Sequence, residues 1–235
     1  MTVHAAARNP EILSYHMQRR IVGILALALP FVLAGGTILA SLLGPAHALP
    51  QPLLQRAISD YYYTPLGTVY VGSLSAIAMF LISSRGYDRA DEIAGYLAGI
   101  FTLGVALFPS ENPRLTRYSR FSIEVGYIHT AFAALMFVAI AYFCLFLFRR
   151  TSAEHRLTRR KQHRNRIYAV CGAAILVCMS VMVDVTLRGL DAWRGLPIHP
   201  LLISESVALI AFGVAWLTKG EGILRDRPQN HIHTG

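Results

Sequence analysis

The chain of 235 residues is 54% hydrophobic and only 15% charged, and its mean hydropathy of +0.44 excludes an ordinary soluble domain. A formal net charge of +9 can indicate a nucleic-acid partner, but the position of the basic residues between apolar segments argues against one. We therefore predict an integral membrane protein that does not bind nucleic acid.

Six apolar segments are close to the roughly 20 residues that a helix needs to cross the hydrocarbon core. In chain order they cover residues 21–43, 64–83, 90–108, 125–148, 167–187 and 200–218. Because the linkers leave no room for a separate soluble domain, we predict one all-α, polytopic transmembrane bundle of six helices. The expected organisation is a cytoplasmic segment over 1–18, the transmembrane domain over 19–219 and a cytoplasmic tail over 220–235.

The basic residues set the expected orientation of the bundle. Sixteen of the 22 Lys and Arg residues fall on the side of the two termini and six fall on the other side. This bias predicts that both termini are cytoplasmic. The basic run before the fifth segment is expected to contact anionic lipid head groups through Arg159, Arg160, Lys161, Arg164 and Arg166.

The third segment contains Gly95-x-x-x-Gly99, a spacing that lets two helix backbones approach closely. We expect this face to lie inside the bundle. The same kind of face also suits packing between chains, so the oligomeric state stays open.

Between the first two segments, the stretch Ile58–Tyr70 places Ser59, Asp60 and three tyrosines at the mouth of an apolar helix. It could be a short amphipathic helix in the interface, and for the tyrosines an aromatic belt is favoured over a ligand-contacting cage. Tyr62 is expected near the entrance of a site.

Ionisable residues intrude into three apolar segments: His129, Asp184 and Glu205. A carboxylate that faces lipid costs at least about 2.5 kcal/mol, so Asp184 and Glu205 are expected to face the bundle or a water-filled cavity. All three lie toward the outer side. Together with Ser59, Asp60 and Tyr62 they predict one outward-facing polar pocket.

Three functions fit such a pocket. The favoured one is binding of a lipid-like or amphiphilic small molecule without chemistry. The alternative is a metal-dependent intramembrane hydrolase of a lipid amide or ester, because one imidazole and two carboxylates can hold a divalent metal. A proton-coupled transporter is third, since the charges stop at one end rather than following a path. The residue types identify no cofactor, and whether a metal binds is open.

Four strings between about Ile58 and Gly220 resemble an uncharacterised bacterial family of six-helix inner-membrane proteins, of the kind filed under domains of unknown function. They are ISDYYYT, GYDRADEIAGYLAGIFTLGVALFP, RNRIYAVCG and ESVALIAFGVAWLTKGE. This resemblance implies a multi-pass protein of the bacterial inner membrane without an assigned activity.

Two further likenesses bear on function. Six helices and an Ile-Ser-Asp after the first outer loop are similar to the DRAM, Frag and Sfk group, which implies a non-enzymatic role. Ser59, Asp60 and His129 resemble in type the zinc ligands of the CREST hydrolases, which include alkaline ceramidases and adiponectin receptors. The chain departs from that pattern because it lacks paired histidines at i and i+4 in a late helix and has six predicted spans rather than seven.

Overall fold

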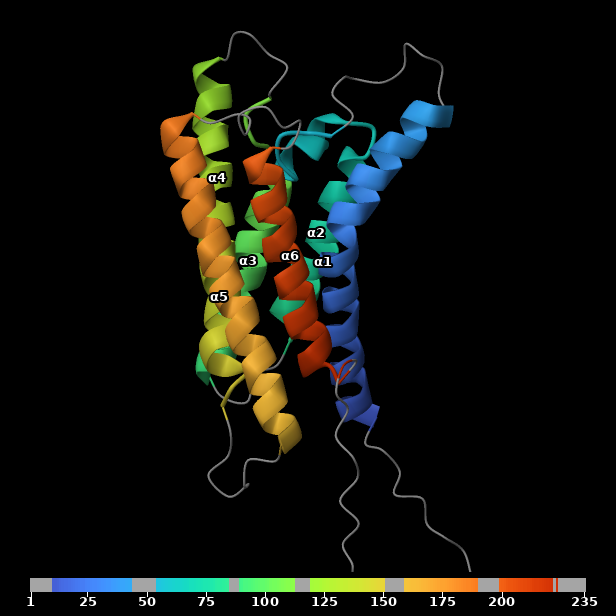
Figure 1. The fold of residues 1–235 in the computed structure, drawn as a ribbon, viewed down its shortest axis with the longest axis vertical. Coiled ribbons are helices and arrows are strands. Elements are labelled where there is room, and N and C mark those ends of the chain that lie inside the picture. The colour runs from blue at the N-terminus through green and yellow to red at the C-terminus, as the bar shows by residue number, and fades with distance from the viewer. Residues whose placement is uncertain are drawn as a thin grey trace, which may run out of the picture.

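The computed structural model describes residues 10–43, 54–84, 89–112, 119–150, 159–189, 199–221 and 223. Within these ranges the chain forms six long helices and no β-strand, as Figure 1 shows. Five of the helices are long and apolar enough to cross a membrane. The predicted all-α bundle of six helices is therefore confirmed.

The helices follow one another with short connections. A 3-10 helix, η1, precedes α2, and a π-helical turn, η2, continues α4. Their bounds are α1 Pro10–Leu43, η1 Ser59–Tyr63, α2 Gly67–Ser83, α3 Arg89–Leu107, α4 Arg120–Tyr142, η2 Phe143–Leu147, α5 Arg159–Arg188 and α6 Pro200–Lys219. Helix α2 is the shorter one, with 17 residues, and at 1.5 Å per residue it extends about 25 Å.

Four helices begin at a residue that differs by three or more positions from the first residue of the predicted apolar segment. Helix α1 begins at Pro10 and α5 at Arg159, because their polar and basic first turns continue into the apolar part without a helix breaker. Helix α4 also begins early, where the Ser119 hydroxyl accepts a hydrogen bond from the Ser122 N–H at 3.1 Å and caps the helix. Helix α2 begins three residues late, at Gly67, because η1 and a turn occupy the preceding residues.

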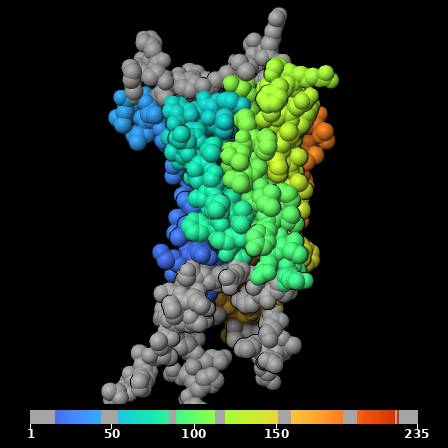
Figure 2. Space-filling model, turned by 180° about the vertical axis from the view of Figure 1, so that it is seen from behind, coloured from blue at the N-terminus to red at the C-terminus, as the bar shows by residue number. Residues whose placement is uncertain are grey.

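The six helices form two layers of three. In one layer α6 packs between α1 and α5, and in the other α3 packs between α2 and α4. Figure 1 shows the first layer in front, and Figure 2 shows α2, α3 and α4 side by side on the opposite face. Contacts between α1 and α2 and between α4 and α5 close the sides of the bundle.

Glycines set the closest approaches between helices. A Cβ atom added to Gly213 of α6 would lie 2.7 Å from the carbonyl oxygen of Gly23 in α1. A Cβ atom added to Gly99 of α3 would lie 2.8 Å from the carbonyl oxygen of Ala78 in α2. Gly95 and Gly99 are both buried, so the expected placement of this face inside the bundle is confirmed.

The start of α1 and the end of α6 lie at the same end of the bundle, which we call the terminal end (Figure 1). The opposite end carries η1, and we call it the η1 end. Both chain ends therefore leave the bundle on one side, as an even number of crossings requires. That this side is the cytoplasm stays a prediction from the charge bias.

Candidate functional site

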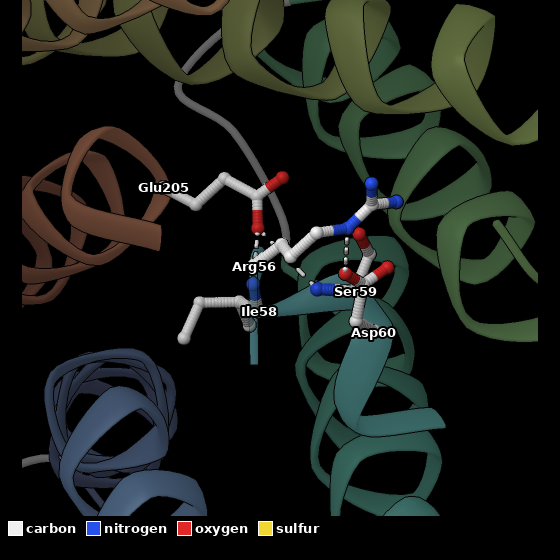
Figure 3. Close-up of polar contacts among 5 residues, drawn as sticks. All are labelled: Arg56, Ile58, Ser59, Asp60 and Glu205. Carbon is white, nitrogen blue, oxygen red and sulfur yellow. Dashed lines mark hydrogen bonds and ion pairs between the residues drawn. The ribbon is translucent and has the colours of Figure 1, made fainter. Parts of the chain in front are cut away.

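A carboxylate of α6 holds the segment that leads into α2. Glu205 Oε2 accepts a hydrogen bond from the backbone N–H of Ile58 at 2.6 Å and another from that of Ser59 at 3.3 Å (Figure 3). The first N–H groups of a helix have no acceptor within the helix itself, so a carboxylate placed there satisfies them. Glu205 thus attaches residues 54–63, which we call the η1 segment, to α6.

The η1 segment is packed into the bundle at several further points. The Tyr63 hydroxyl donates a hydrogen bond to the carbonyl oxygen of Ser110, beyond the end of α3, at 2.6 Å. Ala57, Ile58 and Tyr61 are buried. The expected aromatic belt is therefore wrong for Tyr61, because this ring fills space inside the protein rather than lying among head groups.

A cavity of about 30 Å³ lies beneath the η1 segment, between α2, α3, α4 and α6. A cavity of this size can hold at least one water molecule. The polar part of its wall comes from Ser59, Tyr70, His129 and Glu205. The apolar part comes from Ile58, Leu74, Val105, Ala133, Met136, Phe137 and Leu209.

The wall of this cavity is layered along the bundle axis. Tyr70, His129 and Glu205 lie on three different helices, and each is followed four residues later by an apolar lining residue. Four residues correspond to about 6 Å of helix, so on each of these three helices the polar side chain lies nearer the η1 end than its apolar partner, while Ile58 and Val105 add apolar wall at that end. The apolar partners are Leu74, Ala133 and Leu209.

His129 also joins α4 to the end of α3. Its Nδ1 lies 2.7 Å from the carbonyl oxygen of Phe108, and the side chain is buried. Because a carbonyl oxygen only accepts, Nδ1 carries the proton of this hydrogen bond. The imidazole is thereby held in one orientation at the cavity wall.

The structure brings together three of the six predicted site residues, since Ser59, His129 and Glu205 line the same cavity. Asp60 is buried next to it, and its Oδ2 lies 3.6 Å from Nε of Arg56 in an ion pair (Figure 3). Tyr62 is half-buried and meets the ring of Tyr63 edge to face, with 5.1 Å between ring centroids. A ligand-binding role for these residues stays a prediction.

Asp184 does not face the bundle, and that expectation is wrong. Its Oδ1 lies 2.7 Å from Nε of Arg188, one turn further along α5, and its side chain is 52% exposed. An i,i+4 ion pair at the end of a long helix satisfies the carboxylate locally. Asp184 therefore needs no partner in the interior.

Tyr70 and Arg56 were not predicted from the sequence as site residues. Tyr70 is buried, and its place one turn before Leu74 in an apolar helix is the signal that could have identified it as a cavity residue. Arg56 precedes Asp60 by four residues, the spacing of an ion pair within a helical turn.

Within the residues that the structure describes, no three His, Cys, Asp or Glu side chains gather closely enough to hold a metal ion. His129 and Glu205 line one cavity, but Asp184, the third expected ligand, points elsewhere. The metal-dependent hydrolase stays an untested alternative that these contacts do not favour.

The Asp60 carboxyl predicts a pH-dependent stability. Burial raises its pKa above the ordinary value of 3.8, although Arg56 beside it acts in the opposite direction. The folded protein therefore retains a proton at pH values where the unfolded chain has released it, and the free energy of unfolding falls as pH rises through this range. Thermal unfolding in detergent between pH 4 and 7 is expected to show that Asp60→Asn gains stability relative to wild type with rising pH. A constant difference between the two proteins would contradict this.

The chain was compared with protein-family models, with curated proteins and with solved structures, and no match was found. The resemblances to the bacterial six-helix family, to the DRAM, Frag and Sfk group and to the CREST hydrolases accordingly stay predictions. The geometry of the cavity is what bears on function.

Proposed function

We propose that this multi-pass membrane protein, located in the bacterial inner membrane with both termini cytoplasmic, binds a lipid-like or amphiphilic small molecule at the η1 end without chemistry. The observation that carries the proposal is the layered wall of the cavity. Along each of α2, α4 and α6 the polar lining side chain lies nearer the η1 end and an apolar one follows about 6 Å deeper. An amphiphile has the same order, with its head group at the membrane surface and its chain below.

The contacts of Glu205 indicate what head group is suitable. Its carboxylate already accepts two N–H hydrogen bonds, so a group that replaces them must also donate. Hydroxyl, amide and ammonium groups meet this condition. The head group is therefore expected to carry hydrogen-bond donors rather than to be a bare anion.

The size of the cavity indicates how such a molecule enters. A space of about 30 Å³ is far smaller than an amphiphile. Ile58 and Ser59 of the η1 segment line the cavity, and the segment is attached through Glu205, so in this proposal the segment moves outward to admit the ligand. In this proposal the Glu205 carboxylate gives up its hydrogen bonds from the N–H groups of Ile58 and Ser59 and accepts hydrogen bonds from the ligand instead.

Filling the cavity should reduce binding. Ala133 lines the cavity, whereas its neighbour Ala134 is exposed on the outside of α4, which makes Ala133→Phe and Ala134→Phe a matched pair. The probe is a photoreactive monoacylglycerol with a diazirine in its acyl chain, because its head group supplies hydroxyl donors. We expect saturable labelling of the wild type and about a tenfold weaker apparent affinity for Ala133→Phe, equivalent to about 1.4 kcal/mol.

Ala134→Phe should label like the wild type, and size-exclusion chromatography checks that both variants are folded. Excess unlabelled monoacylglycerol should suppress the saturable labelling. Labelling that rises linearly with probe, or that is equal in the two variants, would overturn the proposed function.

A further inference from the structure

Basic side chains from three separate helices gather at the terminal end, opposite the cavity. Arg19 of α1 and Lys219 of α6 both approach the ring of Phe148, which follows η2. The Arg19 guanidinium carbon lies 5.8 Å from the ring centroid and Lys219 Nζ lies 5.4 Å from it. Two cations therefore share one aromatic ring, although like charges repel each other.

The first turns of α5 add to this positive charge. Lys161 and Arg164, three residues apart on one face of α5, lie within electrostatic range of Lys219. Tyr168, one turn further on, packs against Phe148 with 5.3 Å between the centroids of the two tilted rings, and fixes this face of α5 against the ring. Arg159 and Arg166 are exposed and do not belong to this face. The helix thus divides the basic run into residues that point to Lys219 and residues that point away.

Arg20 completes what we call the basic cluster: Arg19, Arg20, Lys161, Arg164 and Lys219. Arg20 Nε donates a hydrogen bond to the carbonyl oxygen of Gly220 at 2.8 Å, and Lys161 Nζ donates one to the carbonyl oxygen of Arg150 at 3.2 Å. These two carbonyl groups hold the side chains of Arg20 and Lys161 in place within the cluster.

Among the described residues, Asp91 acts electrostatically on Lys219, so one carboxylate already offsets part of the positive charge of the cluster. Asp91 forms an ion pair with Arg150 at 3.2 Å, and Glu221 lies within electrostatic range of His16. The side chain of Arg19 is almost entirely buried. Close cations in a place partly removed from water are stabilised when an anion joins them.

Apolar surface continues directly from the basic cluster. Met17 and Ile24 on α1 are more than half exposed. At 1.5 Å per residue, Ile24 lies about 7 Å further into the span than Arg19. A ligand that fills this place therefore has a phosphate-like head and an adjoining hydrocarbon chain.

We propose that the basic cluster binds the head group of an anionic phospholipid, whose acyl chains lie along the exposed apolar face of α1. Figure 1 shows the start of α1, the end of α6 and the start of α5 at the terminal end, and Arg19, Lys161 and Arg164 all act electrostatically on Lys219. This site is independent of the cavity at the η1 end. Of the basic run this site uses Lys161 and Arg164, and it adds Arg19, Arg20 and Lys219.

Native mass spectrometry of the full chain in detergent tests this site. The protein is titrated with dioleoylphosphatidylglycerol and, separately, with dioleoylphosphatidylcholine. We expect wild type to prefer the anionic lipid, and Lys161→Gln and Lys219→Gln each to reduce that preference about fivefold, equivalent to about 1 kcal/mol per cation. Arg166→Gln, the matched control on the same helix, should leave the preference within about twofold.

Two other outcomes would overturn the proposal. A loss for Arg166→Gln equal to that for Lys161→Gln would show diffuse surface charge rather than a site. Full competition by inorganic phosphate would show a site for a soluble anion. If Lys219→Gln fails to fold, Lys161→Gln decides the question, because Lys161 lies at the start of α5 outside the apolar core and Gln retains a donor for the Arg150 carbonyl.

Discussion

Gly213→Leu is expected to separate α6 from α1 and to destabilise the bundle by about 1–3 kcal/mol or more. The Cβ atom alone would lie 2.7 Å from the carbonyl oxygen of Gly23 and 2.7 Å from the backbone nitrogen of Leu27. Backbone atoms cannot move aside as a flexible side chain can, so the helices must shift apart. Because α6 lies between α1 and α5, the shift would affect the whole layer.

The matched control is Gly72→Leu. Gly72 is exposed on α2, and an added Cβ there meets no atom within 4 Å. Stability is measured as the loss of helical circular dichroism on titration with sodium dodecyl sulfate. Equal midpoints for Gly213→Leu and Gly72→Leu would contradict the close crossing of α1 and α6.

Glu205→Ala is expected to release the η1 segment from α6. Charge-assisted hydrogen bonds contribute about 1.5–3 kcal/mol, so local opening should become about tenfold to 100-fold more frequent. The readout is amide hydrogen exchange, in which the N–H groups of Ile58 and Ser59 should lose protection by this factor. Exchange within the middle of α3 should change little, because the bundle itself is intact.

Ser206→Ala is the control for the Glu205 experiment. The Ser206 hydroxyl donates a hydrogen bond to the carbonyl oxygen of Leu202 in its own helix, so its removal leaves the η1 segment attached. Glu205→Gln keeps an acceptor oxygen and should lie between wild type and Glu205→Ala. If Glu205→Ala and Ser206→Ala exchange alike at Ile58, Glu205 does not hold the segment.

The sequence predicted the fold because hydrophobic length and charge bias are local properties of a membrane helix. It did not predict where α1 and α5 begin, since their first turns are polar and lie outside the apolar window. Gly95 and Gly99 were identified as a packing face by their spacing. The crossing of Gly23 and Gly213 was missed because single glycines show no such spacing.

The site was partly predictable for a related reason. His129 and Glu205 are conspicuous in apolar segments, and the structure places both at one cavity. Asp184 is equally conspicuous, but Arg188 four residues later was the sequence signal that it has a local partner. The role of Glu205 could not be predicted, because its partners are backbone N–H groups 146 and 147 residues away.

The most direct test of the proposed function is to map the residues that the photoreactive monoacylglycerol labels, by peptide mass spectrometry of the wild-type protein. Binding in the cavity predicts saturable labels on α4 and α6 at cavity residues such as Met136, Phe137 and Leu209. These labels should disappear in Ala133→Phe and persist in Ala134→Phe. Labels confined to exposed residues such as Leu135 and Val207, and unchanged by either variant, would contradict binding at the η1 end.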